Sequence, residues 1–294
     1  MKYIVFIFSA TMVLAQSTSH QTIGFYNVEN LFDHIDDPLT YDNEYTPEGE
    51  KKWSNKHLNQ KINQLSSVIA SVGFRESLQT PLLMGLAEVE NHYVLDLLVN
   101  SPLLKASNYG IVHFESPDFR GIDVGLLYKA SLFNVVHQKR YSLELTDNKT
   151  GYKRTTRDIL VVGGYFYEHY LSIIVNHWPS RRGGKKRSAA HRFKAAQLNR
   201  HITDSIQKKR PTGYLISMGD FNDNPSDKSI QWITQKEKKG FGLYNPMIAL
   251  HKKGEGSLAY NDRWFLFDQI LFSQQWKKQK FLHIKKQPFI ILFI

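Results

Sequence analysis

Short apolar runs of strand length recur along most of the sequence, and this pattern restricts the fold more than any other feature. Only a few stretches between them have the length and periodicity of helices. Many short strands with few intervening helices are typical of two β-sheets packed face to face, with helices outside them. The runs predicted to be strands are residues 22–26, 82–87, 123–128, 159–167, 171–175, 214–218 and 264–272.

Two segments show the periodicity of amphipathic helices. In each, apolar residues recur three or four positions apart, so one helix face is apolar and packs on the core. Ser54 or Asn55 is the expected N-cap of the first helix. Residues 35–53 and 181–187 are expected to be surface loops that could border a site. The apolar stripes are Leu58, Ile62, Leu65, Ile69 and Val72 in the first segment, and Ala195, Leu198, Ile202 and Ile206 in the second.

The composition is that of a globular protein with an anionic partner. Of the 294 residues, 41% are hydrophobic and 22% are charged, and no long linker marks a boundary, so we expect one folded domain. Lys and Arg number 38 against 27 Asp and Glu, a formal charge of +11, which favours an anionic partner without separating nucleic acid from a lipid headgroup. The absence of cysteine excludes disulfides and thiolate chemistry.

The first residues have the pattern of a secretory signal peptide. Met1 and Lys2 precede an apolar run over residues 3–14, and the small residue Ala15 stands before a possible cleavage point at Gln16. The alternatives are a buried strand or a membrane anchor, but the run is shorter than the roughly 18 residues that span a bilayer. We therefore expect a signal peptide over residues 1–15 and a secreted or periplasmic protein. We also expect a monomer without stable membrane insertion.

Polar residues that could carry chemistry follow the predicted strands directly. Asn27, Glu88, His177, Asp220 and Asn222 each stand at such an end, where side chains converge on one rim of a sandwich. Carboxylates, amides and an imidazole together can hold a hard divalent cation, contact a phosphate and orient a water. Taken singly, each also fits a structural role, such as a turn residue, a helix cap or a hydrogen-bonded histidine.

Asp268 is less easily explained as a structural residue, because it interrupts the apolar run WFLFDQILF. An ionised carboxylate buried there without a partner would cost several kcal/mol or shift its pKa. An imidazole beside it would supply a donor and would itself be oriented as a general base. A helix cap or a structural ion pair is the alternative.

Six sequence blocks in order resemble the endonuclease/exonuclease/phosphatase family, which includes deoxyribonuclease I and exonuclease III. The resemblance implies an α/β fold, a four-layer α/β/β/α sandwich of two mixed sheets flanked by helices, over residues 22–294. It also implies hydrolysis of a phosphoester with Mg²⁺, or with Mn²⁺ or Ca²⁺ in its place. The blocks are NVENLFD (27–33), GLAEVEN (85–91), RGIDVGLLY (120–128), VNHWPSRRGG (175–184), GDFND (219–223) and FDQILFS (267–273).

The same resemblance implies a role for each matched residue. Asn27 and Glu88 match the metal-binding positions. His177 matches the histidine that contacts the scissile phosphate, and Asp220 and Asn222 match the pair that orients the attacking water. Asp268 matches the aspartate that orients a second histidine.

Four further residues are expected to contact substrate phosphate. Arg120 and Tyr128 belong to a block that often borders the site in this family. Arg181 and Arg182 belong to the basic loop RRGGKKR, which directly follows the His177 block and could meet the backbone of a polyanion.

The sequence departs from the family in one respect. Family members close with a Ser-Asp-His motif on a last strand, whose histidine is the partner of the residue matched by Asp268. Here only His283 follows Asp268, within FLHIKKQP, and an apolar run ends the sequence. We interpret this as a last strand that is missing or altered, after a reading frame cut short or shifted, and expect hydrolysis to be slowed.

Three functions remain open at this point. The leading hypothesis is an exported endonuclease that acts on DNA or RNA. A phospholipid or inositol-phosphate phosphoesterase would use the same chemistry on another substrate. A truncated, inactive homologue would keep only the anion-binding surface.

Overall fold

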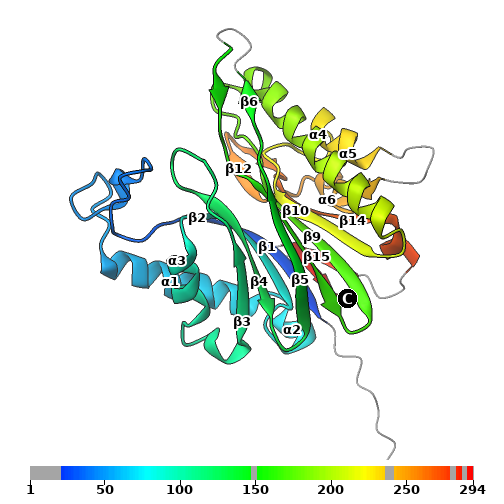
Figure 1. The fold of residues 1–294 in the computed structure, drawn as a ribbon, viewed down its shortest axis with the longest axis horizontal. Coiled ribbons are helices and arrows are strands. Elements are labelled where there is room, and N and C mark those ends of the chain that lie inside the picture. The colour runs from blue at the N-terminus through cyan, green and yellow to red at the C-terminus, as the bar shows by residue number, and fades with distance from the viewer. Residues whose placement is uncertain (1–20, 147–150, 236–241, 279–282, 287–289, 294) are drawn as a thin grey trace, which may run out of the picture.

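The structure, a computed structural model, describes residues 21–146, 151–235, 242–278, 283–286 and 290–293. The expected signal peptide (1–15) lies outside the described residues. Two six-stranded β-sheets pack face to face, with helices on their outer faces (Figure 1). The predicted fold class, an α/β four-layer sandwich, is confirmed.

The first sheet has the strand order β15-β16-β1-β2-β4-β3. Helices α1 (Asn55–Ser71) and α3 (His92–Val99) cover its outer face, where the apolar stripe predicted for α1 packs against β1, β2 and β4 (Figure 1). The strands are β1 (Thr22–Leu31), β2 (Leu83–Val89), β3 (Tyr109–His113), β4 (Asp123–Lys129), β15 (His283–Lys286) and β16 (Ile290–Phe293).

The second sheet has the order β11-β14-β10-β9-β8-β5. Helices α4 (Lys185–Lys209) and α5 (Lys228–Thr234) pack on its outer face. A buried Asn199 on α4 donates to Asn176 Oδ1 at 2.8 Å and to Ser217 Oγ at 2.9 Å, which ties the helix to β9 and β10. The strands are β5 (Phe133–Tyr141), β8 (Ile159–Phe166), β9 (His169–His177), β10 (Tyr214–Asp220), β11 (Leu243–Tyr244) and β14 (Asp268–Ser273).

Short elements fill the connections between these layers. Two small hairpins stand at the ends of the sandwich, and three 3-10 turns and two further helices lie in loops. They are β6 (Leu145–Thr146) with β7 (Lys153–Arg154), β12 (Leu258–Tyr260) with β13 (Arg263–Phe265), η1 (Asn43–Tyr45), η2 (Lys105–Ser107), η3 (Gln274–Lys278), α2 (Phe74–Ser77) and α6 (Met247–Lys252).

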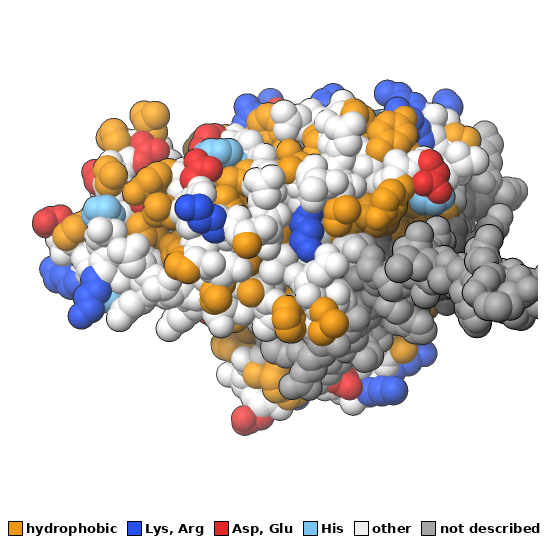
Figure 2. Space-filling model, turned by 90° about the horizontal axis from the view of Figure 1, so that it is seen from below, with side chains coloured by type: hydrophobic (Ala, Val, Ile, Leu, Met, Phe, Trp, Pro, Cys, Tyr) orange, Lys and Arg blue, Asp and Glu red, His pale blue; other side chains and the backbone are white. Residues whose placement is uncertain are grey.

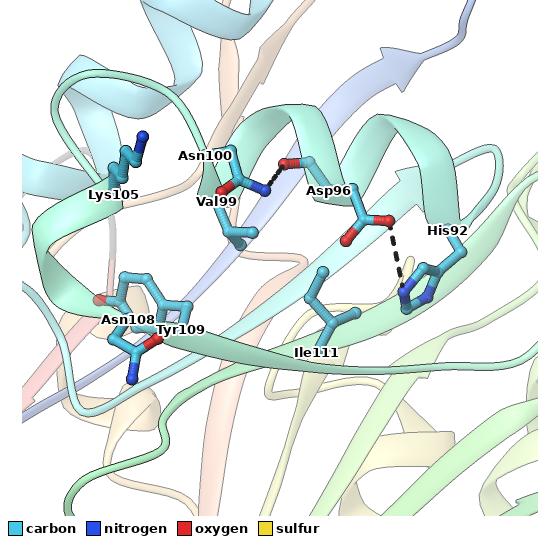
Figure 3. A pocket seen from close by; sticks show the side chains of 8 residues that line it. All are labelled: His92, Asp96, Val99, Asn100, Lys105, Asn108, Tyr109 and Ile111. Carbon is cyan, nitrogen blue, oxygen red and sulfur yellow. Dashed lines mark hydrogen bonds and ion pairs between the residues drawn. The ribbon is translucent and has the colours of Figure 1, made fainter.

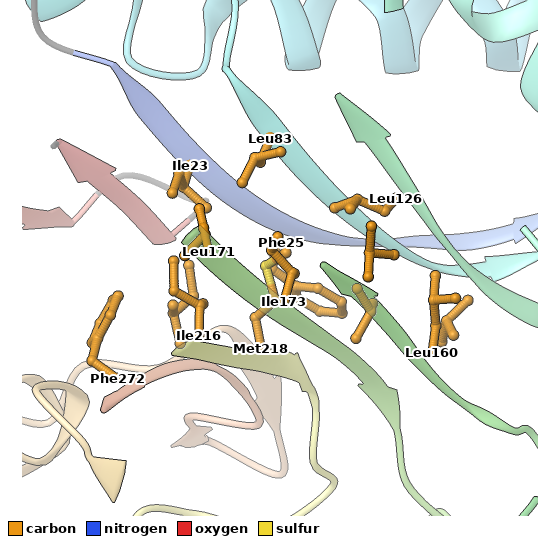
Figure 4. Packing of buried hydrophobic residues seen from close by; sticks show 14 of the residues in the cluster. Ile23, Phe25, Leu83, Leu126, Leu160, Leu171, Ile173, Ile216, Met218 and Phe272 are labelled. Atoms are coloured by element: carbon orange, nitrogen blue, oxygen red, sulfur yellow. The ribbon is translucent and has the colours of Figure 1, made fainter. Parts of the chain in front are cut away.

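The main core lies between the two sheets. Figure 4 shows apolar side chains of both sheets, among them Phe25, Leu83 and Leu126 from the first and Ile173 and Met218 from the second, directed into the same layer. All five are fully or almost fully buried. Burial of apolar surface contributes about 25 cal/mol per Å², so this layer fixes the position of one sheet against the other.

The surface away from this core is mixed. Seen from below (Figure 2), apolar, basic and acidic side chains are interspersed. Within the described residues, no helix combines the length and the apolar character needed to cross a membrane.

Two sequence predictions about local structure need correction, and strand β5 was missed. The run 264–272 is not one strand, because β13 ends at Phe265 and β14 begins at Asp268. The basic loop 181–187 is shorter than expected, because α4 begins at Lys185. Strand β5 was not predicted, since most of its residues are exposed at the edge of the sheet and give no apolar run.

The C-terminal strands extend the first sheet beside β1. Strand β16 pairs antiparallel with β1, with Thr22 opposite Phe293, and β15 pairs with β16, with His283 opposite Phe293. His283 is therefore level with Thr22, five residues along the strand from Asn27, or about 16 Å at roughly 3.3 Å per residue. The register places the backbone of His283 at the end of the sheet away from Asn27.

A group of carboxyl side chains anchors the loop between β1 and α1. Glu90, which follows β2, accepts a hydrogen bond from the backbone N–H of Asp33 at 2.6 Å. Burial raises the pKa of Glu90 to about 9; the hydrogen bond from Asp33 lowers it, and the charges of Asp33 and Asp42 raise it. Glu90 is thus protonated at neutral pH and can share its proton with Asp42.

The first prediction concerns the stability cost of keeping this proton. The pKa of Glu90 in the folded chain lies above its ordinary value of 4.5. Between about pH 4.5 and 9 the unfolded chain therefore releases a proton that the folded chain holds, and the free energy of unfolding falls as pH rises. The substitution Glu90→Gln imitates the protonated acid. It should stabilise the protein by about 1–3 kcal/mol at pH 8, and much less at pH 5.

Urea unfolding of both proteins at pH 5 and pH 8 measures the difference. Glu48→Gln is the control, because it removes an exposed carboxylate of the same loop. A stability difference between Glu90→Gln and the wild type that does not grow with pH would contradict the prediction.

Candidate active site

The strand ends predicted to converge do meet at one rim of the sandwich. In the second sheet, Asp220 on β10 is directly opposite His177 on β9 and Asp268 on β14. In the first sheet, Asn27 on β1 is opposite Ala87, the residue before Glu88 on β2. Because both sheets end here, side chains from distant parts of the chain share one cluster.

The Asn27 side chain joins the two sheets at this rim. Its Nδ2 donates to Glu88 Oε1 and to Asp220 Oδ2, both at 3.2 Å, while its Oδ1 accepts from the backbone N–H of Glu29 at 2.9 Å. Asn27 therefore sets the spacing of two carboxylates that would otherwise repel each other.

Glu88 is directed into the cluster by an irregularity of β2. The register between β2 and its neighbours shifts at this residue, and Glu88 has a left-handed backbone conformation with φ of 64°. Such a conformation costs a non-glycine residue of order 1–3 kcal/mol and is common at functional sites. The bulge turns the carboxylate of Glu88 toward Asp220 and His177 instead of along the sheet.

His177 is a buried, neutral imidazole. Its Nε2 lies 3.7 Å from Glu88 Oε1 and 3.8 Å from Asp220 Oδ2. Burial lowers the pKa of His177 well below its usual value, and the nearby charges of Arg157 and Arg120 lower it further. At these distances the neutral ring is neither ion-paired nor hydrogen-bonded to the two carboxylates. A neutral imidazole can donate a hydrogen bond from one nitrogen only.

Asp220 and Asn222 form a rigid turn after β10. The backbone N–H of Asn222 donates to Asp220 Oδ1 at 2.9 Å, and Asn222 Nδ2 donates to the Trp178 carbonyl at 3.0 Å. Burial raises the pKa of Asp220 to about 6, with the Glu88 charge adding to the rise while hydrogen bonds from Asn222 and Asn27 oppose it. A cation or a bound proton would therefore stabilise the Asp220 carboxyl group.

Asp268 lies at the start of β14 with one oxygen unsatisfied. Its backbone N–H donates to Ser257 Oγ at 3.1 Å. Its Oδ1 is inaccessible to solvent and, within the described part of the chain, receives no hydrogen bond. Burial raises the pKa of Asp268 well above its usual value, and the charge of Asp220 adds to this. The need for a donor, predicted from the sequence, is therefore present in the structure.

Two charged residues of the site were not predicted from the sequence. Arg157, buried just before β8, donates to the Trp178 carbonyl at 2.8 Å and to Asp118 Oδ2 at 3.2 Å. Asp118 also pairs with Arg120, at 3.4 Å. The only signal in the sequence was a charged pair, Arg157 and Asp158, directly before an apolar strand.

The loop over residues 35–53 does border the cluster, through Tyr45. The Tyr45 ring stacks on Phe32, with ring centroids 4.1 Å apart. Burial raises the pKa of Tyr45 to about 12, with the charges of Glu44 and Glu88 adding to the rise and Arg120 opposing it. The charges of Glu88 and Arg120 therefore act on the Tyr45 phenol, which borders the cluster.

The structure separates the four residues expected to contact phosphate. Tyr128 is opposite Leu83, about 16 Å along β2 from Glu88 at roughly 3.3 Å per residue, and packs on Phe133. The expectation for Tyr128 is therefore wrong, because the block runs along a strand and only its first part reaches the rim. Arg120 lies at the site, and Arg182 lies on the surface beside it.

Arg181 is held against the turn after β10. Its guanidinium bonds the Asn222 carbonyl at 2.8 Å, Asp223 at 3.1 Å and Asp227 at 2.8 Å, and it also lies over the Phe267 ring. These bonds use Nε and Nη2 of Arg181, and its Nη1 remains the group that would contact phosphate, so the expectation for Arg181 stays a prediction. Its contacts stabilise the turn that holds Asn222.

Two groups of residues have the chemistry to hold a cation. Glu88 and Asp220 offer carboxylate oxygens of the kind that Mg²⁺ prefers, and the Asn27 amide directs its Nδ2 at both of them while its Oδ1 accepts from the Glu29 N–H. These residues fit a hard divalent ion. A second group at the outer edge of the first sheet joins His113, Glu115 and Asp123, whose ligand atoms lie within 4.8 Å of one another.

The hollow beside α3 is separate from the cluster. It has a volume of about 260 Å³, and Figure 3 shows its polar side chains spread around the rim, with Asp96 linked to His92 and Asn100 donating to the Asp96 carbonyl. Since these residues do not converge on one point, this hollow is not the candidate active site.

Several solved structures are similar to the chain in fold. TDP2 of D. rerio, complexed with a single-strand DNA product, is 16% identical with a TM-score of 0.54, over 94% of this chain and 98% of that one. The human Nocturnin catalytic domain with bound sulfate is 14% identical, with a TM-score of 0.54 over 94% of each chain. The mannosyl-6-phosphatase Bt3783 of Bacteroides thetaiotaomicron VPI-5482 is 12% identical, with a TM-score of 0.52 over 93% and 98%.

At these identities the likeness shows the fold alone, and no curated protein matches the chain. The sequence profile of the endonuclease/exonuclease/phosphatase family, however, matches residues 22–291. Members of this family are hydrolases that act on phosphoester bonds. Because this match spans nearly the whole chain and includes every residue of the cluster at the rim, the chain belongs to the endonuclease/exonuclease/phosphatase family.

Proposed function

We propose that the protein is a divalent-metal-dependent phosphodiesterase that cuts nucleic acid, and that it is an exported endonuclease. The observation that carries the proposal is the bridge from Asn27 to Glu88 and Asp220, with His177 within 4 Å of both carboxylates. This arrangement places a cation site, a neutral imidazole and a partly protonated carboxylate around one point. Those are the groups that hydrolysis of a phosphoester requires.

Glu88 and Asn27 are the residues proposed to hold the metal, with Asp220 at its side. Mg²⁺ is the proposed ion, with Mn²⁺ or Ca²⁺ as alternatives, because all the donors are oxygens and few of them are charged. When bound, the ion supplies positive charge to the phosphoryl oxygens. It would also offset the repulsion between Glu88 and Asp220.

The remaining steps are assigned to side chains of the chain itself. His177, held neutral, donates a hydrogen bond from Nε2 to a phosphoryl oxygen and stabilises charge that develops there. Asp220, with a pKa of about 6, accepts a proton from the attacking water, and Asn222 fixes its carboxylate. Asp268, which is opposite Asp220 in the sheet, is assigned as a positioning residue.

Nucleic acid is the proposed substrate class because of charge and likeness together. The chain carries a formal charge of +11, and the D. rerio TDP2 structure of the same fold holds a single-strand DNA product. Export is proposed from residues 1–15 and would be seen as a mature N-terminus at Gln16 in a mass spectrum of the extracellular or periplasmic fraction. A protein retained with Met1 in the cytoplasm would contradict export alone.

The second prediction is that hydrolysis depends on the cluster. Asp220→Asn and His177→Gln should each lower the rate of cleavage of single-stranded DNA by about 10²- to 10⁴-fold, because each removes a group that moves or donates a proton. Tyr128→Phe is the matched control and should retain the wild-type rate, since Tyr128 lies outside the site. Rates are measured on folded protein with saturating Mg²⁺.

Two results would reject this function. Cleavage that persists in excess chelator would remove the metal from the mechanism. Hydrolysis of a sugar phosphate monoester with no cleavage of DNA, RNA or bis(p-nitrophenyl) phosphate would instead make the protein a phosphomonoesterase.

The third prediction locates the metal without an activity assay. Mg²⁺ or Mn²⁺ at about 100 times its dissociation constant should stabilise the fold by about 2.7 kcal/mol. That corresponds to a rise in Tm of about 2–4 °C per kcal/mol for a domain of this size class. Glu88→Gln should abolish most of the rise, because it removes the main anionic ligand.

Glu115→Gln is the control for this measurement. It removes a carboxylate from the separate group with His113 and Asp123. A rise in Tm that survives Glu88→Gln but is lost in Glu115→Gln would place the ion at the outer edge of the first sheet and refute the assignment to Glu88.

A further inference from the structure

A basic pocket of about 470 Å³ lies beside the candidate active site. Arg120 and Arg157, whose charges act on His177, belong to both, and Pro179 and Ser180 form part of its wall directly after the His177 strand. We refer to it as the arginine pocket. Its cationic or titratable lining residues are Arg120, Arg154, Arg157, Arg182, Arg187 and His191.

The arginine pocket has a large excess of positive charge. Among the described residues no acidic side chain lines it, and the one carboxylate behind it, Asp118, is shared by Arg120 and Arg157. Arg154, Arg182 and Arg187 are exposed and form no ion pair with the described part of the chain. Five guanidinium groups thus face one carboxylate, an excess of four positive charges.

The base of the pocket is built and not merely a charged surface. Arg157 is almost completely buried, and its Nε is inaccessible to solvent and has no hydrogen-bond partner in the described part of the chain. Its other two nitrogens are held by Asp118 and the Trp178 carbonyl, which fix the guanidinium in place. Because Arg120 shares Asp118 with Arg157, one carboxylate serves two guanidinium groups here, and the base of the pocket keeps a net positive charge that favours an anion.

The N-terminus of α4 adds to this preference. Gly183 lies in the pocket wall, and α4 begins at Lys185 with no side chain capping it from Gly184. The first backbone N–H groups of a helix carry partial positive charge and bind phosphate oxygens. Guanidinium groups and a helix N-terminus together match a phosphate group better than a carboxylate or a neutral ligand.

We infer that the arginine pocket binds a second, non-reacting phosphate group of the substrate while the first lies at the cluster of Asn27, Glu88 and Asp220. This rests on the proposed function for the position of the reacting phosphate. The protein is then selective for substrates that carry two phosphate groups close together. Such a group can come from a phosphorylated end of a nucleic acid or from a small bisphosphate.

The inference is tested by binding, so that it does not depend on turnover. The thymidine dinucleotide TpT and its 5′-phosphorylated and 3′-phosphorylated forms are titrated by calorimetry into the full-length Asp220→Asn protein. A terminal phosphate at one of the two ends should tighten binding about 10- to 100-fold. The combined variant Arg154→Gln, Arg182→Gln and Arg187→Gln, made in the same background, should lose this gain.

A matched control removes positive charge elsewhere. Arg210 lies on the Tyr170 ring beyond the last turn of α4, far along the helix from the pocket. Arg210→Gln should therefore keep the gain from the terminal phosphate. All three arginines of the combined variant are exposed, so its thermal unfolding should match that of the parent protein.

A second pair of ligands identifies the source of the phosphate. Glucose 1,6-bisphosphate is compared with glucose 6-phosphate under the same conditions. A gain for both pairs means that any second phosphate is accepted, and a gain for the dinucleotides alone identifies a nucleic acid end. No gain for either pair, or a gain that persists in the combined variant, overturns the inference.

Activity assays separate this result from the proposed function. Wild-type protein that cleaves TpT and its phosphorylated forms at the same kcat/KM keeps the phosphodiesterase and refutes the pocket. Protein that binds the phosphorylated forms more tightly but cleaves none of them keeps the pocket and refutes the hydrolase.

Discussion

The contact between the Asn27 amide and the two carboxylates of Glu88 and Asp220 is the interaction on which the rest of the site depends. It joins the rims of two separate sheets, whose relative position is set mainly by the apolar layer between them. Because close packing leaves little room for the sheets to slide, an amide of this length can hold both carboxylates at once. The site is thus a consequence of how the core is packed.

Burial explains why these groups have unusual protonation. His177 is buried at the rim, and Asp220 and Asp268 are partly buried beside it, so all three lose much of their contact with water. Burial disfavours the charged form of each, which lowers the pKa of His177 and raises the pKa of Asp220 and of Asp268. Arg120 and Arg157, which pair with Asp118, supply positive charge near these groups. Neither arginine forms a direct pair with His177.

The sequence was sufficient for the layers and for most of the cluster, because both depend on local patterns. Strand-length runs predicted the sheets, and polar residues directly after them predicted Glu88 and Asp220. Arg157 and Asp118 could not be predicted in this way, since their pairing depends on how two loops fold together. Tyr128 was assigned wrongly because a motif does not show which of its residues reach the rim.

The position of β14 and β16 near the end of the sequence also restricts when the site can form during synthesis of the chain. Asp268 enters the cluster on β14, and β16 completes the first sheet beside the strand that carries Asn27. Contacts this distant in sequence close slowly and only after the intervening chain exists. On a ribosome, an N-terminal portion of the chain would contain Asn27 and Glu88 but not yet His177, Asp220 and Asp268 of the second sheet. A site divided between the two sheets in this way therefore forms only late in the synthesis of the chain.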